Sequence, residues 1–408
     1  MRALSQQTLK NPETAYCLLQ DTSRRLERQA DFLQQLQNQL LVSGGGGGDG
    51  GGAGNVSYEE TKPRIIKASN MLISQSSSNL LNWKGHLERE QSERRALHQA
   101  NVILRNLFVL HQDTLQLTRH LLQSDKIWTT FAHTRAHQTT VCSTMEQIRS
   151  RHATTMETVA DLVLLLRPYK LVPKQTLTNF LRGRLAVQVL CDHYVSLEKG
   201  RANGGVSVDC WLEPVVQEAW TEAKHLCEAH YQAAPEIILQ DECSVPVTLI
   251  RPWLNHSLVE MFKNAMVASM ETLPSSLSSA NYKPPPIEVC LQMVRNDENI
   301  EFACIDIKDH GSGFHGDPYQ FASSPEKWDR LDVQQSYASV RSPLSSLGVG
   351  VPSSQWLLQH FGGNLELQNR DPRLGSAGGP DASGGCTATL TLPLDDDVPE
   401  YLPVAGGT

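Results

Sequence analysis

The sequence lacks the signatures of several protein classes. Its nine cysteines form no CxxC pair and several lie in apolar segments, so we interpret them as reduced core thiols of an intracellular protein, not as a zinc site or a disulfide framework. No apolar run approaches the about 20 residues that a membrane span requires. Lysine and arginine do not cluster into a tail and the formal net charge is -8, which argues against a nucleic-acid-binding surface spread over the protein.

The composition itself is that of a soluble globular protein, with 40% hydrophobic and 20% charged residues. A chain of 408 residues is too long for one ordinary core, so we expect two domains. Residues 1–12 contain Arg2 and Lys10 with no acidic residue before Glu13. That pattern is compatible with an organelle transit segment and equally with an ordinary polar terminus.

The first part of the chain combines a helical pattern with a glycine tract. Residues 14–42 are rich in Gln and Leu and predict an amphipathic helix, which runs into glycines over residues 44–54. A glycine tract buries no apolar surface and loses much backbone entropy on ordering, so we expect a flexible linker. We therefore assign residues 1–61 to an N-terminal extension.

Residues 62–199 show helical periodicity with very little glycine. One stripe contains Ile103, Leu107, Leu110 and Leu117, and a last long helix is expected over residues 175–198. Several long helices with short joins predict a four-helix-bundle-like domain over residues 62–200. The segment RANGGVSV at residues 201–208 is the expected boundary.

The pattern changes after this boundary, because short β-rich runs now alternate with helices. Strands are expected at residues 237–239, 245–250, 287–294, 300–308, 365–368 and 387–392, and the third and fourth form a hairpin. The irregular alternation predicts a mixed α/β layer and not a doubly wound parallel sheet. We assign residues 201–396 to this domain and residues 397–408 to a short tail.

A helix expected at residues 251–269, between the second and third strands, separates into two faces. Its apolar stripe consists of Leu254, Leu258, Met261, Phe262 and Ala265. Its polar stripe carries His256, Glu260 and Asn264 at i, i+4 and i+8. An acid between an imidazole and a carboxamide suits a nucleotide site with a metal and a general base. The alternative is a surface helix with a solvated polar face.

Four short motifs follow one another in this second domain. They are EMFKN at residues 260–264, DHGSG at 309–313, GVG at 348–350 and GGC at 384–386. Glycines before a helix leave backbone N–H groups free for phosphate oxygens, and an aspartate at a strand end accepts a hydrogen bond from an exocyclic amine. Taken singly, each motif is also explained by a turn or a helix entry.

In this order, the four motifs resemble the GHKL nucleotide-binding fold of gyrase, the ninety-kilodalton heat-shock chaperone, histidine kinases and mismatch-repair ATPases. Within that superfamily, EMFKNAM at residues 260–266 is similar to the E-[LF]-[FL]-K-N-[AS]-M of the mitochondrial pyruvate and branched-chain 2-oxo acid dehydrogenase kinases. The resemblance covers residues 65–393 approximately. It implies an α + α/β fold class, in which an N-terminal helical domain precedes a GHKL-type α/β sandwich that binds ATP.

The resemblance also implies roles for individual residues. Glu260 would be the general base for a substrate serine hydroxyl and would also belong to the nucleotide-binding residues. His256 would tune it, Asn264 would hold Mg²⁺ and Asp309 would read adenine. Further nucleotide-binding positions would shape the site and its lid. They are Lys263, Gly311, Gly313, Ser346, Gly348, Gly350, Cys386 and Thr387. The plainer alternatives are that His256 only caps or packs, and that Lys263 contacts only solvent.

The implied function is an ATP- and Mg²⁺-dependent protein serine kinase of the mitochondrial matrix. It would phosphorylate and inactivate the decarboxylase component of a 2-oxo acid dehydrogenase complex, dock a lipoyl domain through its helical half, and form a homodimer. The short sequence after Leu394 is similar to that of the branched-chain kinase. The histidine at position 256 is similar to that of the pyruvate dehydrogenase kinases, so the choice between the two complexes stays open.

Three positions depart from the family pattern, namely Val267, Ser346 and Cys386, where an arginine, a glycine and a threonine are usual. They motivate a second hypothesis, a regulatory pseudokinase that binds nucleotide without transferring phosphate. A third hypothesis is a protein histidine kinase. It lacks support because the histidines of the helical half, among them His98, His111, His120 and His152, are without the expected acidic residue and proline.

Overall fold

A computed structural model describes residues 12–44, 77–131, 135–166, 172, 174–201, 204–243, 245–272, 283–295, 300–321, 348–370 and 384–394. Several sequence predictions lie outside these residues. They concern the transit segment before Pro12, the glycine tract after Gly44, Ser346 and the tail at residues 397–408.

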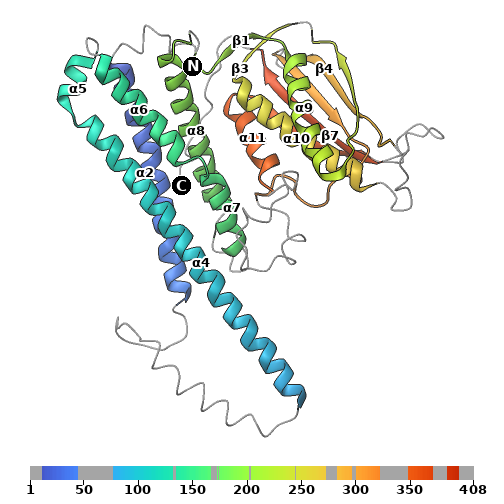
Figure 1. The fold of residues 1–408 in the computed structure, drawn as a ribbon, viewed down its shortest axis with the longest axis horizontal. Coiled ribbons are helices and arrows are strands. Elements are labelled where there is room, and N and C mark those ends of the chain that lie inside the picture. Colours follow the sequence, from blue (N-terminus) through green and yellow to red (C-terminus); the bar gives the residue numbers. More distant parts are fainter. Residues whose placement is uncertain are drawn as a thin grey trace.

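The N-terminal part of the described chain is helical. Its elements are α2 (Pro12–Gly44), α4 (Ser77–Leu122), α5 (Asp125–Thr130), α6 (Arg135–Arg151), α7 (Thr155–Leu166) and α8 (Lys174–Glu198). In Figure 1, α2 lies along α4, and α6, α7 and α8 complete the bundle beside them. The helical periodicity that the sequence shows over residues 62–199 is therefore present in the structure wherever this range is described.

Helix α2 belongs to the core of this helical part. Leu19, Leu26 and Leu33 recur at seven-residue spacing, and all three side chains are fully buried. They pack in clusters with residues of α4, α6 and α8. The assignment of residues 1–61 to a separate extension was wrong for α2, because the helical part begins at Pro12 and not at residue 62. The glycine tract between α2 and α4 suggested a domain boundary, but α2 packs against helices that follow the tract.

The C-terminal part combines helices with a mixed sheet. Its elements are β1 (Ser207–Cys210), α9 (Leu212–Tyr231), β2 (Ile237–Asp241), β3 (Val247–Leu249), α10 (Arg251–Glu271), β4 (Ile287–Arg295), β5 (Glu301–Lys308), α11 (Gly350–His360), β6 (Asn364–Arg370) and β7 (Gly385–Pro393). All the expected strands are present. Only β1, which pairs with β3, has no counterpart in the sequence prediction.

The main sheet has five strands in the order β2-β4-β5-β7-β6. Strand β2 is parallel to β4, and the other neighbours are antiparallel. The predicted hairpin is confirmed, since Arg295 of β4 pairs with Glu301 of β5. Helices α9, α10 and α11 lie together on one side of this sheet (Figure 1). The mixed topology confirms the α + β character of the fold.

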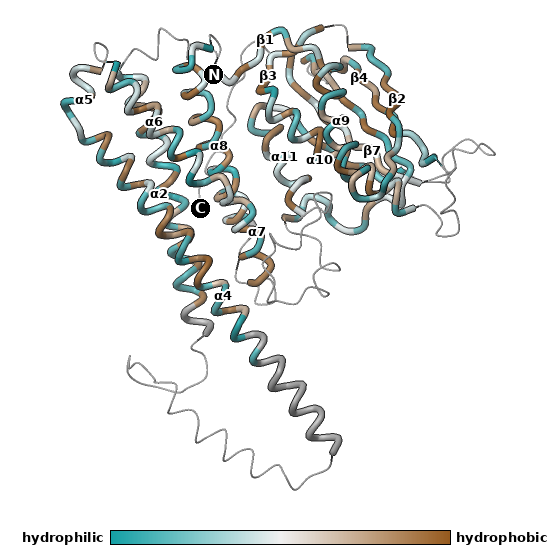
Figure 2. The backbone as a smooth tube through the Cα atoms, viewed as in Figure 1, coloured by the Kyte–Doolittle hydropathy of each residue, from teal (hydrophilic) through white to brown (hydrophobic). Residues whose placement is uncertain are grey.

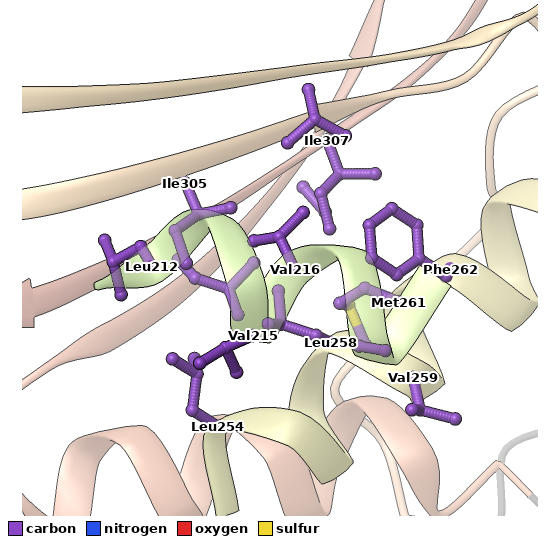
Figure 3. Packing of buried hydrophobic residues seen from close by; sticks show 14 of the residues in the cluster. Leu212, Val215, Val216, Leu254, Leu258, Val259, Met261, Phe262, Ile305 and Ile307 are labelled. Carbon is purple, nitrogen blue, oxygen red and sulfur yellow. The ribbon is translucent and has the colours of Figure 1, made fainter. Parts of the chain in front are cut away.

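The apolar stripe of α10 forms the centre of the C-terminal core. Leu258 and Phe262 are fully buried, in one cluster with Val216 of α9 and Ile305 of β5. Figure 3 shows these side chains gathered between the helices and the sheet. Hydrophobic and hydrophilic residues alternate along the helices (Figure 2), as expected for helices with one buried face. The expected packing of the apolar face against the later strands is therefore confirmed.

The helical and C-terminal parts share a second hydrophobic cluster. It joins Phe180 and Leu185 of α8 to Trp253 of α10 and Trp356 of α11. Arg182 of α8 also donates from Nη2 to Oε1 of Gln359, at 2.5 Å. This hydrogen bond joins α8 of the helical part to α11 of the C-terminal part. None of the helices in the described ranges is long and apolar enough to cross a membrane.

Candidate functional site

The polar stripe of α10 emerges at the edge of the buried core. The helix starts after β3 with Pro252 in its first turn, where the missing backbone N–H costs no hydrogen bond. Because the opposite face is buried between α9 and the sheet, His256, Glu260 and Asn264 must lie on the side that the core leaves open.

Glu260 is held by two close neighbours. Its Oε1 accepts a hydrogen bond from Nζ of Lys263 at 2.8 Å, and the two side chains are only 15% and 11% exposed. Its Oε2 lies so close to Gly350, the first residue of α11, that a Cβ atom at that position would overlap it. Gly350 is therefore needed for the approach of the carboxylate to the start of α11.

Glu260, Lys263 and His256 line a cleft of about 420 Å³ between the helical and C-terminal parts. The other lining residues come from α7, α8, α10 and α11 and the residue before α11. They are Met156, Glu157, Leu185, Gln188, Asp192, Pro252, Trp253, Val349, Gly350, Ser353 and Leu357. The cleft thus brings polar groups of both parts around the Glu260 carboxylate.

His256 lines this cleft with an exposed side chain, although protein atoms surround much of the imidazole. This desolvation lowers the pKa of His256, and the nearby Lys263 ammonium acts in the same direction while Glu260 opposes it. At neutral pH, the imidazole is consequently uncharged and able to accept or donate a hydrogen bond one turn from Glu260.

A second pocket, of about 240 Å³, lies on the other side of the stripe. Asn264 of α10 lines it together with Asp309 and Phe314, which follow β5. The other lining residues are Met261, Ala265, Ala268, Ile307, Gly313, Pro318, Gly348, Val351, Pro352, Leu367, Cys386 and Ala388. The mostly apolar wall with a few polar groups is typical of a site for a flat organic ring.

Asp309 is the buried acid of this pocket, at 5% exposure. Its Oδ1 accepts hydrogen bonds from the backbone N–H groups of Gly311, at 2.8 Å, and Cys386, at 3.2 Å. Burial raises the pKa of Asp309, and these two hydrogen bonds limit the rise. The carboxyl group is therefore held in place through its Oδ1, at a position that lines the pocket.

The glycines of the DHGSG motif allow the loop after β5 to lie close to its neighbours. A Cβ at Gly311 would come within 2.5 Å of the Cβ of Ala268 on α10. Gly313 has φ 74°, a conformation that other residues rarely adopt. The motif thus serves the close approach of the Asp309 loop to α10.

The structure brings the predicted residues together around two adjoining spaces instead of one. Asn264, Asp309, Gly313, Gly348 and Cys386 line the smaller pocket. His256, Glu260, Lys263 and Gly350 line the larger cleft. Of the rest, Gly311 packs on α10 and Thr387 lies within β7, opposite Lys308 and Gln368. Val267, at the position of a family arginine, packs against the C-terminal core.

Three residues near the pocket were not found from the sequence. Asn369 and Arg370, at the end of β6, hydrogen-bond to the backbone of Phe314 and Asp309. The hydroxyl of Tyr319 accepts a hydrogen bond from the N–H of Leu367, at 2.7 Å. These residues carry no motif, and their partners lie 48 to 61 positions away in the sequence.

The protein side chains near Asn264 could bind a metal ion only if another molecule supplied further ligands. Among the described residues, no group of three or more His, Cys, Asp and Glu side chains is arranged to hold an ion. Magnesium commonly takes one or two protein oxygens and completes its shell with phosphate oxygens and water. The Asn264 carbonyl oxygen is suited to such a shared site, which requires a nucleotide.

Comparison with known proteins finds similarity over part of the chain. The family model described as mitochondrial branched-chain alpha-ketoacid dehydrogenase kinase matches residues 74–221. A mitochondrial pyruvate dehydrogenase (acetyl-transferring) kinase of Ascaris suum is 26% identical over 248 residues, which cover 55% of this chain and 58% of that protein. Isozyme 1 of Mus musculus is 26% identical over 253 residues, covering 55% and 54%. The chain thus spans about half the length of these relatives.

The kinase of the same name from Drosophila melanogaster is 24% identical over 295 residues, covering 65% of both chains. Among solved structures, a mycobacterial sensor histidine kinase, MprB, aligns with 17% sequence identity and a TM-score of 0.27, over 46% of this chain and 97% of that one. A TM-score this low carries no weight for the fold.

Proposed function

We propose that this chain, which is related over about half of its length to the mitochondrial 2-oxo acid dehydrogenase kinases, is an ATP-dependent protein serine kinase. One observation carries the proposal. Glu260 and Asn264 lie one turn apart on α10, and the helix presents the first to a cleft and the second to a pocket. The phosphate acceptor and the phosphate donor would therefore occupy separate spaces, the cleft and the pocket, on either side of α10.

The smaller pocket is the proposed nucleotide site. Asp309 accepts a hydrogen bond from the exocyclic amine of adenine, while Leu367 and Ala388 contact the ring. Asn264 would hold Mg²⁺ through its carbonyl oxygen, and the ammonium of Lys263, which lines the neighbouring cleft, would neutralise charge on phosphates that reach that cleft. Phosphoryl transfer depends mainly on such positioning and charge neutralisation, and a bound Mg²⁺ would supply part of that neutralisation.

The larger cleft is the proposed site of the acceptor serine. Glu260 removes the proton of the serine hydroxyl, and the uncharged His256 tunes the carboxylate from the preceding turn. Walls from α7 and α8 on one side and α10 and α11 on the other shield the reacting groups from water.

The relatives are named as kinases of pyruvate dehydrogenase (acetyl-transferring). We therefore propose the decarboxylase component of a mitochondrial pyruvate or branched-chain 2-oxo acid dehydrogenase complex as the substrate that this chain inactivates. In this proposal, the protein works in the mitochondrial matrix as a homodimer. The helical part, residues 12–44 with 62–200, docks a lipoyl domain, and residues 201–396 form the kinase domain.

Transfer of labelled phosphate from ATP to purified decarboxylase components, assayed side by side for the pyruvate and branched-chain complexes, tests this function. Replacing Glu260 by Gln should reduce transfer by at least about 100-fold, because a general base typically contributes that much. Nucleotide affinity should remain, since Glu260 lines the other space. The control is Glu213→Gln on α9, whose exposed carboxylate accepts a hydrogen bond from Gln217 of the same helix.

Two results would contradict the kinase assignment. Nucleotide binding without Glu260-dependent transfer to any component would indicate a pseudokinase. Autophosphorylation that is stable to alkali and lost in acid would indicate a histidine kinase. The structure gives no support to the latter at His111 and His152, because both side chains are almost fully buried in the helical part.

A further inference from the structure

The end of β6 lies against the loop that carries Asp309. Two consecutive residues there, Asn369 and Arg370, reach across to backbone groups of Phe314 and Asp309. In the sheet these residues pair with Cys386 and Gly385 at the start of β7. The start of β7 and the end of β6 thus meet the Asp309 loop at one point.

Asn369 bonds to both backbone groups of Phe314. Its Oδ1 accepts from the Phe314 N–H at 2.9 Å, and its Nδ2 donates to the Phe314 carbonyl oxygen at 2.8 Å. The side chain of Asn369 therefore makes the two hydrogen bonds with the Phe314 backbone that a residue of a neighbouring β-strand would otherwise make. A Cβ at Gly313 would come within 2.6 Å of the same Oδ1, so the glycine lets the loop approach Asn369.

Arg370 fixes the other end of the loop. Its Nη2 donates to the carbonyl oxygen of Asp309, and the same group passes Gly385, where a Cβ would come within 2.8 Å of it. Asp309 is also bonded to Cys386, through its own N–H to the Cys386 carbonyl oxygen at 3.0 Å. The loop is therefore attached at its first residue, Asp309, and at its last, Phe314.

We infer that Asn369, with Arg370, is a positioning residue for base selection, which fixes the loop of residues 309–314 so that the Asp309 carboxylate meets the exocyclic amine of a bound adenine. Asp309 and Phe314, the two residues that are held, both line the nucleotide pocket. This inference rests on the proposed function, because it assumes that the pocket binds an adenine nucleotide. It adds that selectivity depends on a residue that does not itself line the pocket.

Calorimetric titration of the full chain with ADP and with inosine 5′-diphosphate, which has an oxygen in place of the amine, tests this inference. The wild type should prefer ADP. In Asn369→Ala the ADP affinity should fall about tenfold, as the loss of one to two hydrogen bonds implies, while the affinity for the inosine nucleotide changes little. Asn369→Asp, which keeps the acceptor and loses the donor, should lie in between. Gln368→Ala, which changes an exposed neighbour on β6, is the matched control.

Hydrogen exchange separates a local change from unfolding. In Asn369→Ala, the amide of Phe314 should exchange faster, while amides in the middle of β5 stay protected. An equal loss of affinity for both nucleotides, or an unchanged preference for ADP, would overturn the inference and leave the kinase assignment intact. A wild type that binds neither nucleotide would overturn the proposed function and the inference with it.

Discussion

Nζ of Lys263 lies 2.8 Å from Oε1 of Glu260, one turn away on the same helix, and both side chains are nearly buried. A carboxylate so shielded from water is costly without a donor or a counter-charge. The helix supplies both from within the EMFKN motif. The proposed general base is therefore stabilised before any substrate arrives.

Removing the Lys263 ammonium should show how much the buried Glu260 carboxylate depends on it. Lys263→Gln is expected to lower the free energy of unfolding by about 1–3 kcal/mol, because the Glu260 carboxylate loses a charged donor. Glu260→Gln combined with Lys263→Gln should cost less than the sum of the single changes, by about 1 kcal/mol or more. Denaturant unfolding measures each variant. Additive single effects would show that the pair is not coupled.

The exposed pair of Lys224 and Glu228 on α9 gives the control for this cycle. Its atoms are 3.8 Å apart, and its side chains are 31% and 43% exposed. Since water and salt screen such a pair, Glu228→Gln, which leaves Lys224 in place, should change the free energy of unfolding by less than about 0.5 kcal/mol.

Gly350 provides a second test of how the Glu260 carboxylate is placed. A Cβ in Gly350→Ala would overlap Oε2 of Glu260, so the side chain must move away from the start of α11. We expect phosphate transfer to fall about tenfold or more, because small misplacements of a reacting group are costly. Steady-state kinetics should show the loss in kcat more than in the KM for ATP. Gly205→Ala is the control, because its Cβ would meet His193 only at ordinary contact distance, 3.7 Å.

The sequence predicted the fold well where periodicity and packing agree. Leu258 and Phe262 recur at helical spacing and are buried, and the hairpin of β4 and β5 follows from two apolar runs with a polar join. Helix α2 was also predicted, but not its place in the bundle. Its partners in α4 and α8 come after a glycine tract, and periodicity gives no information about which distant helices meet.

The candidate site was predictable only in its motif residues. Glu260, Asn264 and Asp309 stand in segments whose composition suggests their chemistry. Asn369 gave no such signal, because an asparagine at a strand end is ordinary and its partner Phe314 lies 55 positions away. The division into a cleft and a pocket was equally hidden, since it depends on how α7 and α8 cover α10.

Cys386 should be a slow nucleophile despite lining the pocket. Burial, together with the charge of Asp309, raises the pKa of this thiol to about 12, so little thiolate is present at pH 8. Iodoacetamide should therefore modify the exposed Cys17 long before Cys386. Mass spectrometry of timed samples measures both rates, and the unfolded chain, in which all thiols react alike, is the control. Equal rates in the folded protein would contradict the raised pKa of Cys386.

The helical part contains a buried pair of histidines that should make stability depend on pH. The rings of His111 and His152 lie 4.6 Å apart between their centroids, and both side chains are at most 1% exposed. Nδ1 of His111 lies 2.7 Å from the carbonyl oxygen of Leu107. Desolvation lowers the pKa of His111 to about 4 and that of His152 to about 2, and the nearby charge of Arg184 acts in the same direction.

In the folded state, both histidines therefore stay uncharged at a pH where the unfolded chain already binds protons. Their contribution to stability is complete above pH 6.5, about the unfolded pKa, and falls as the pH drops below it toward the folded pKa values. Between pH 7 and pH 5.5, we expect the free energy of unfolding to decrease by about 1–3 kcal/mol for the pair. Urea unfolding at the two pH values measures this difference. This difference in the free energy of unfolding should be smaller in the double variant His111→Gln/His152→Gln. It should be unchanged in His225→Gln, which replaces an exposed histidine of α9. An unchanged pH dependence in the double variant would assign the effect to other groups.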